Sequence, residues 1–257
     1  RVKIGMKMTV FTLFPEMFSA LNASLLGKAQ EKEVLDISII DFRLYSEDKH
    51  KKVDDTPCGG GVGMLLKPEP LVNALETNLD YEEDGLEIIL MSPQGIPFSQ
   101  KEANYLSTKK HLAFICGHYE GFDERIRSFV SKEYSIGDYV LTGGELPAMV
   151  IIDSVSRLIG GVIKESASYE EDSFYQGLLE YPQYTRPRTF RGMEVPEVLL
   201  SGHHANIARW QKKEALRRTL LRRRDLLEAY SFTKEDRILM REILEEESID
   251  DFSIELC

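Results

Sequence analysis

Strand-like and helix-like segments alternate through the first half of the chain, and this alternation constrains the fold more than any other feature of the sequence. Residues 9–14, 35–39, 87–91 and 111–116 carry the apolar and β-branched side chains that are typical of strands. Strands that alternate with helices form βαβ units, whose sheet is mainly parallel. The sequence therefore predicts an α/β domain over residues 1–164.

Apolar residues repeat at helical spacing in four segments of this domain. One helix is expected to open at Pro15 and to bury Phe18, Leu21 and Leu25 on one face. The strand at 87–91 is expected to stop at the turn Ser92–Gly95. The other three helices are predicted over residues 71–79, after a capping Ser99, and over residues 145–159.

The character of the sequence changes after residue 164. Residues 165–177 are polar, acidic and weakly periodic, which is typical of a mobile interdomain linker. Helical periodicity begins at Ile207, and a last helix is predicted near residues 234–247. We therefore expect a smaller, mostly helical domain over residues 178–257, with a buried stripe of Leu216, Leu220 and Leu227.

Charge and cysteine content narrow the class of protein. The chain has 43 acidic and 32 basic residues, a net charge of −11, which argues against unspecific binding along a whole nucleic acid but allows a local basic face. Cys58, Cys116 and Cys257 stand far apart, as expected for reduced thiols in a cytoplasmic protein. No apolar run reaches the about 20 residues that a membrane helix needs, and no secretory signal is evident.

Three loops that contain glycine each follow a strand signal: residues 92–95, 117–121 and 136–145. The carboxyl ends of parallel strands meet at one edge of a sheet, where ligands bind. Glycine permits close approach, so backbone groups of these loops could contact a purine edge. We therefore predict a shared ligand pocket, with apolar walls supplied by the third loop.

Other motifs are weaker. The glycine run 59–61 matches neither a dinucleotide-binding fingerprint nor a phosphate loop, but it can bring backbone close to a ligand or to a partner subunit. A thiol enzyme that uses Cys58 lacks an evident partner histidine. Adjacent residues rarely chelate one metal ion, so the pair His203–His204 predicts no metal site.

Lysine and arginine gather on one helical stretch between residues 212 and 224. Such a basic face on an acidic protein is the electrostatic footprint of a phosphate-binding surface. The alternative is a solvated helix face whose cations pair with nearby acids. The candidate RNA contacts on this stretch are Lys212, Lys213, Arg217, Arg218 and Arg222.

The string GHYEGFDER at 117–125, followed by IGDYVLTGGELPA at 136–148, resembles the bacterial tRNA (guanine-N1)-methyltransferases that modify the guanosine at position 37. The strings LFPEMF at 13–18, EDSF at 171–174 and SGHH at 201–204 support the resemblance, which runs from Met8 to Tyr230. It implies a SPOUT-type fold with a deep trefoil knot and S-adenosylmethionine as the methyl donor. It also implies a homodimer with active sites shared between chains, a tRNA substrate and a need for Mg²⁺, although no residue cluster forms an evident Mg²⁺ cage.

The resemblance assigns three catalytic residues, and the chemistry agrees with their types. Neutral guanine N1 is a poor nucleophile, so a carboxylate base helps, and Asp172 occupies that position. Negative charge develops toward O6, which the cationic Arg157 would stabilise. Glu120 would help to place the methyl group beside the sulfonium charge of the donor.

Further residues follow from the same matching. The donor contacts are Ser92, Pro93, Gly117, Tyr119, Glu120, Ile136, Gly137, Asp138, Tyr139, Val140, Leu141, Gly143, Gly144 and Pro147. Besides the basic helix, the resemblance places Lys49, His50 and Arg186 beside the RNA.

Two positions depart from the pattern of the family. His118 stands where some members have arginine, and Arg224 stands where many have proline, so the helix is expected to continue there. Two alternatives remain: a SPOUT methyltransferase with another target, such as a ribose oxygen, and a non-catalytic RNA-binding module. Asp172 argues against the first, because ribose methylation needs no guanine N1 base, and the intact pocket strings argue against the second.

Overall fold

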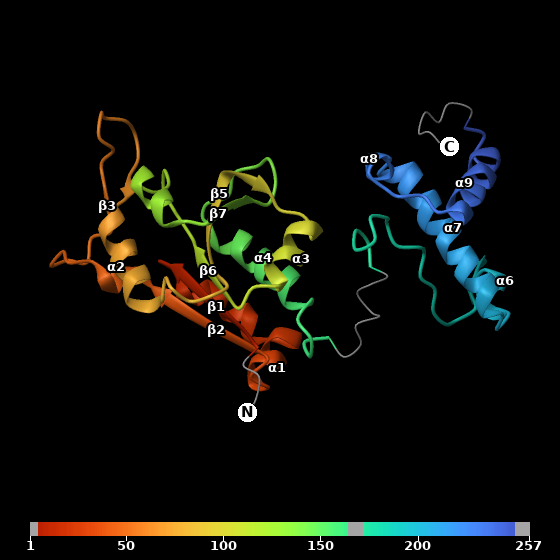
Figure 1. Cartoon of the computed structure of the whole chain (residues 1–257), viewed down its shortest axis with the longest axis horizontal. Coiled ribbons are helices and arrows are strands. Elements are labelled where there is room, and N and C mark those ends of the chain that lie inside the picture. The colour runs from red at the N-terminus through yellow and green to blue at the C-terminus, as the bar shows by residue number, and fades with distance from the viewer. Residues whose placement is uncertain (1–4, 164–171, 250–257) are drawn as a thin grey trace. The chain divides into compact units, whose positions relative to one another are not determined.

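The computed structural model describes residues 5–163 and 172–249. The chain divides into two compact units, residues 1–166 and 167–257, and each is described by itself (Figure 1).

A five-stranded sheet forms the centre of the first unit. Its strands are β1 (Met6–Thr12), β2 (Leu35–Asp41), β5 (Leu86–Pro97), β6 (His111–Ile115) and β7 (Lys132–Ser135). Their order is β2-β1-β6-β5-β7, and every neighbouring pair is parallel. The predicted α/β class is confirmed, whereas the trefoil knot stays a prediction.

Alternate side chains of the sheet enter two separate hydrophobic cores. Met8 and Phe114 pack on one face, together with Val155. Phe11 and Ile115 pack on the other. The covering elements are η1 (Pro15–Asn22), α1 (Ser24–Glu31), α3 (Gln100–Ser107) and α4 (Glu145–Ser156) on the first face, and η2 (Phe42–Tyr45), α2 (Pro68–Asn78) and η3 (Glu124–Phe129) on the second. A small ribbon of β3 (Asp54–Asp55) and β4 (Leu65–Leu66) accompanies them.

Two local predictions about helices in this unit are wrong. The segment after Pro15 is not one helix: η1 ends at Asn22, Ala23 is extended, and α1 then begins, so Leu25 is 52% exposed. Ser99 stands at the N-cap of α3, but its side chain makes no capping hydrogen bond.

The strand prediction at 87–91 also differs from the structure, since β5 does not end at Ser92. Its pairing with β7 stops at Met91 and resumes at Ile96, so residues 92–95 form a bulge inside the strand. A Cβ atom added at Gly95 would lie 2.5 Å from the backbone nitrogen of Tyr134, which explains why glycine stands there.

The second unit is mostly helical, as predicted. It contains the hairpin β8 (Thr189–Phe190) and β9 (Met193–Glu194), followed by α6 (Glu197–Leu200), α7 (His204–Arg222), α8 (Asp225–Glu228) and α9 (Lys234–Glu246). The expected leucine stripe is buried here, together with Leu239, Met240 and Ile243 from α9. A capping box between Thr233 and Asp236 begins α9.

The end of α7 corrects one expectation. The helix does not continue through Arg224, because Arg223 leaves the helical conformation and α8 starts at Asp225.

Part of the predicted linker, residues 165–171, lies outside the described residues. Residues 172–177 form a hydrogen-bonded turn, in which the backbone nitrogen of Phe174 donates to the carbonyl oxygen of Leu178 (2.7 Å). No helix among residues 5–163 and 172–249 has the length and apolar character needed to span a membrane.

Candidate functional site

A cavity of about 490 Å³ lies in the first unit, where the carboxyl ends of β5, β6 and β7 meet. Its walls are the bulge of β5, the loop after β6, the loop after β7 and the first turn of α4. The three glycine loops therefore meet in one pocket, as their positions after strands predict. The predicted donor residues that line it are Ser92, Pro93, Gly117, Tyr119, Glu120, Ile136, Gly137, Tyr139, Val140, Leu141, Gly143, Gly144 and Pro147, and Asp138 is not among the lining residues.

Close backbone contact holds the second loop against the third. The backbone nitrogen of Gly144 donates to the carbonyl oxygen of Gly117 (2.9 Å). A Cβ atom added at Gly144 would lie 2.8 Å from the Cα atom of Cys116, and one at Gly117 would lie 2.5 Å from the ring of Phe122. A larger residue at Gly144 would press against the backbone of the second loop, and one at Gly117 would displace the Phe122 ring.

A buried hydrogen-bond chain beneath the pocket escaped the sequence prediction. Glu145 is fully buried at the start of α4. Its carboxylate accepts a hydrogen bond from the Thr12 hydroxyl (2.7 Å) and contacts Nε2 of His118 at 2.7 Å. The His118 ring also packs against Phe14, with ring centroids 4.5 Å apart. The end of β1, the loop after β6 and the start of α4 are thus joined through one carboxylate.

Glu120 lies on the exposed rim of this pocket, beside the glycine run. Its backbone nitrogen donates to the carbonyl oxygen of Met64 (3.1 Å). A Cβ atom added at Gly63 would lie 2.6 Å from Oε1 of Glu120, so glycine at 63 leaves space for this carboxylate. The run at 59–61 itself is exposed, with no neighbouring atoms within 4 Å of added Cβ atoms.

The other two predicted catalytic residues belong to different units. Arg157 is the C-cap residue of α4 in the first unit. Asp172 is the first described residue of the second unit, where its carbonyl oxygen accepts a hydrogen bond from the backbone nitrogen of Tyr175 (3.3 Å).

The two cysteines within the described residues lie in different environments. Burial raises the pKa of the Cys116 thiol well above its usual value, and Cys58 is exposed beside the glycine run. Cys257 lies outside the described residues. Within residues 5–163 and 172–249, no group of three His, Cys, Asp or Glu side chains is arranged to hold a metal ion.

Three of the predicted RNA contacts lie on exposed loops: Lys49 and His50 after η2, and Arg186 before the cis peptide bond to Pro187.

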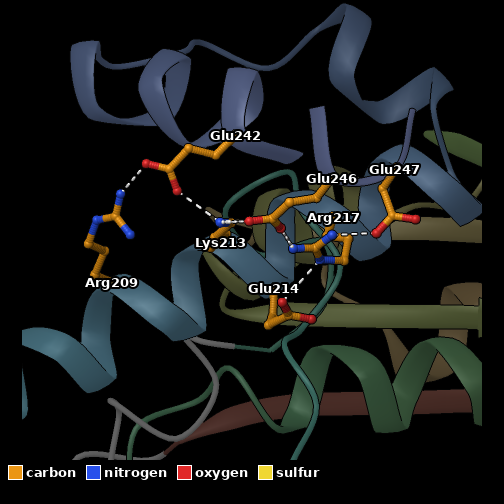
Figure 2. Close-up of polar contacts among 7 residues, drawn as sticks. All are labelled: Arg209, Lys213, Glu214, Arg217, Glu242, Glu246 and Glu247. Carbon is orange, nitrogen blue, oxygen red and sulfur yellow. Dashed lines mark hydrogen bonds and ion pairs between the residues drawn. The ribbon is translucent and has the colours of Figure 1, made fainter. Parts of the chain in front are cut away.

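The basic stretch on α7 is largely engaged by α9 (Figure 2). Nζ of Lys213 donates to Glu242 (2.8 Å) and to Glu246 (2.7 Å). Arg217 pairs with Glu246, with Glu247 and, at 3.1 Å, with Glu214. Hydrogen bonds from Lys213 and Arg217 hold the pKa of the Glu246 carboxyl below its usual value.

Other cations of α7 differ in their partners. Arg209 pairs with Glu242, and Lys212 donates to the Tyr230 hydroxyl (2.7 Å) and lies 3.5 Å from the Asp236 carboxylate. Arg218 and Arg222 form no ion pair with a carboxylate of the described residues. Pairing with nearby acids, the alternative prediction for the basic stretch, therefore applies to Lys212, Lys213 and Arg217. It does not apply to Arg218 and Arg222 among the described residues.

Comparison with known proteins decides the family. The family model for tRNA (guanine-1)-methyltransferase TrmD matches residues 6–229. The chain belongs to this family. It is 59% identical over 243 residues to the tRNA (guanine-N(1)-)-methyltransferase of Brevibacillus brevis, covering 94% of this chain and 99% of that protein. It is 55% identical over 243 residues to that of Lacticaseibacillus paracasei, covering 95% of each. Family membership confirms the resemblance and the predicted enzyme class, a tRNA (guanine-N1)-methyltransferase.

Proposed function

We propose that the chain transfers a methyl group from S-adenosylmethionine to N1 of the guanosine at position 37 of tRNA. The observation that carries the proposal is the meeting of three glycine loops in one cavity, within a chain of the tRNA (guanine-1)-methyltransferase family. A volume of about 490 Å³ suits a nucleoside-sized ligand, since ligand pockets commonly measure about 300–1,000 Å³.

The pocket suits the donor in chemical character as well as in size. Backbone groups of the loops offer hydrogen bonds to an adenine edge, and Ile136 and Leu141 offer apolar walls. The exposed carboxylate of Glu120 at the rim would attract a sulfonium cation. When bound, S-adenosylmethionine supplies an electrophilic methyl group.

The residues of the chain would prepare the guanine for attack. In this proposal, Asp172 accepts the N1 proton and thereby makes N1 nucleophilic. Arg157 stabilises the negative charge that develops at O6. Glu120 orients the donor, so that the methyl group faces N1.

A homodimer with shared active sites completes the proposal. The exposed side of α4 carries Leu146 (49% exposed) and Val150 (45% exposed), one helical turn apart. Such a pair supports an apolar interface between copies. We also propose a trefoil knot in domain 1–164, tRNA binding by domain 178–257 and a cytoplasmic location.

The tRNA is proposed to contact the exposed cations Lys49, His50, Arg186 and Arg222 and the half-buried Arg218. Mg²⁺, which commonly keeps several waters, is proposed to act in the same reaction.

The test is methyl transfer from labelled S-adenosylmethionine to unmodified tRNA transcripts with guanosine or adenosine at position 37, followed by mass spectrometry. Label at N1 of the guanosine, and none with adenosine, is expected. Label at a ribose oxygen or at another base would overturn the proposed target. Absence of label from a chain that binds both ligands would overturn the proposed reaction.

Asp172→Ala tests the assignment of the base. It is expected to abolish turnover while donor binding, measured by calorimetry, stays near that of the unchanged chain. Asp80→Ala, which removes an exposed carboxylate from a loop of the first unit, serves as the control and should retain turnover. Loss of donor binding in Asp172→Ala would contradict the role of a base.

A further inference from the structure

The cations of α7 form two rows that face different directions. Arg209, Lys213 and Arg217 are spaced by four residues, and Arg218 and Arg222 form a second set with the same spacing. Residues four apart lie on one side of a helix, and each residue step turns the helix by about 100°. The second row is therefore rotated by about 100° from the first.

The first row is matched by carboxylates of α9 and its C-cap. Glu242 contacts Arg209 and Lys213, Glu246 contacts Lys213 and Arg217, and Glu247 contacts Arg217 (Figure 2). With Glu214, the cluster holds three cations and four carboxylates, so its formal charge is negative.

Two properties of this cluster oppose phosphate binding. The side chains of Lys213 and Arg217 are only 14% and 18% exposed, so a phosphate has little access to them. An approaching phosphate would also meet the charges of Glu242, Glu246 and Glu247, and like charges repel. The first row is therefore suited to holding α9 rather than to binding RNA.

The second row has the opposite character. No described carboxylate pairs with Arg218 or Arg222. On this row Arg222 is exposed and Arg218 is half-buried. Two guanidinium groups one turn apart present hydrogen-bond donors that match successive phosphate oxygens.

Resting on the proposed function, we infer that α7 contacts the tRNA backbone through Arg218 and Arg222, while Arg209, Lys213 and Arg217 fasten α9 to α7. The inference narrows the predicted RNA surface and gives the acidic residues of α9 a structural role.

The test compares two double variants that remove the same charge from the full-length chain: Arg218→Ala with Arg222→Ala, and Lys213→Ala with Arg217→Ala. The dissociation constant for tRNA is measured between about 50 and 200 mM NaCl. The first pair is expected to weaken binding and to reduce the slope of log K against log salt by about 1.4–1.8, which corresponds to two phosphate contacts. The second pair is expected to keep the slope.

A stability measurement separates fastening from binding. Trp210, the single tryptophan, lies in α7, so its fluorescence in urea reports the unfolding of the second unit. The Lys213 and Arg217 pair is expected to lower the midpoint, and the Arg218 and Arg222 pair to leave it nearly unchanged.

A third double variant tests the first row even if the Lys213→Ala and Arg217→Ala variant misfolds. Glu246→Gln with Glu247→Gln keeps every cation and retains side chains that accept hydrogen bonds. An unchanged salt slope is expected, whereas a steeper slope would show that the first row faces the RNA and would overturn the inference. An unchanged slope in the Arg218 and Arg222 pair would also overturn it. If the protein without substitutions methylates tRNA, either of these overturning results leaves the proposed function intact. If that protein does not bind tRNA, both the proposed function and the inference about α7 are overturned.

Discussion

Gly143→Ala is expected to break the hydrogen bond between His118 and Glu145. The added Cβ atom would lie 2.3 Å from Nε2 of His118 and 2.5 Å from Oε2 of Glu145, between the two bonded atoms. Neither side chain can move freely, because Thr12 holds the buried Glu145 and the His118 ring packs against Phe14. Gly143 does not have a positive φ, so alanine adds no backbone strain of that kind.

The size of the effect follows from the groups involved. A hydrogen bond to a charged group contributes about 1.5–3 kcal/mol, and replacing glycine by alanine stabilises by about 0.4–1 kcal/mol through the unfolded chain. The free energy of unfolding of the first unit should therefore fall by about 0.5–2.6 kcal/mol.

Urea unfolding of the donor-free chain measures this loss. Far-UV circular dichroism follows both units, and Trp210 fluorescence follows only the second, which should not change. Gly160→Ala is the matched control, since Gly160 lacks a positive φ and an added Cβ atom there meets nothing within 4 Å. If Gly143→Ala changes the free energy by less than about 0.5 kcal/mol, as ordinary surface substitutions do, the hydrogen bond does not hold these loops together.

Two further predictions concern pH and packing. Burial lowers the pKa of His111 despite its hydrogen bond to Glu83, so below about pH 6.5 the unfolded chain takes up a proton that the folded chain does not. Stability should therefore fall as the pH is lowered below about 6.5, by at most about 1.4 kcal/mol per pH unit. His111→Asn should flatten this slope in urea titrations, whereas an equal slope in the variant would assign it to other groups. Leu216→Ala, at a fully buried site, should lower the unfolding free energy reported by Trp210 by about 2–5 kcal/mol, and Leu221→Ala, at an exposed site, should change it by less than about 0.5 kcal/mol. Equal effects of the two leucine variants would contradict the core described for the second unit.

The pocket could be predicted from the sequence because its signals are local. Gly117 and Ile136 come within two residues of the ends of β6 and β7, and parallel strands bring such loops to one edge of the sheet. The bulge at residues 92–95 was less predictable, since proline and glycine after a strand also mark an ordinary turn. Only the pairing that resumes between Ile96 and Tyr134 distinguishes a bulge from a turn that ends the strand.

The contacts that escaped prediction are those between residues distant in the chain. Glu145 looks like an acidic residue in the first turn of a helix, where it interacts favourably with the helix dipole. Nothing near it in the sequence indicates that Thr12 donates to it, because that contact depends on where β1 ends beside α4. Likewise, Glu242 and Glu246 have the spacing of an ordinary solvated helix face, and only the packing of α9 against α7 pairs them with Lys213.

The strand order also has a consequence for the growing chain. β1 lies between β2 and β6, so one of its edges can pair early, whereas the other waits until residues 111–115 have been synthesised. Residues 42–110 must emerge first, which takes roughly 3–14 s at about 5–20 residues per second. During that interval the unpaired edge of β1, which carries Val10 and Phe11, can pair with other chains. We expect nascent chains of this length to depend on chaperones more than the finished protein does.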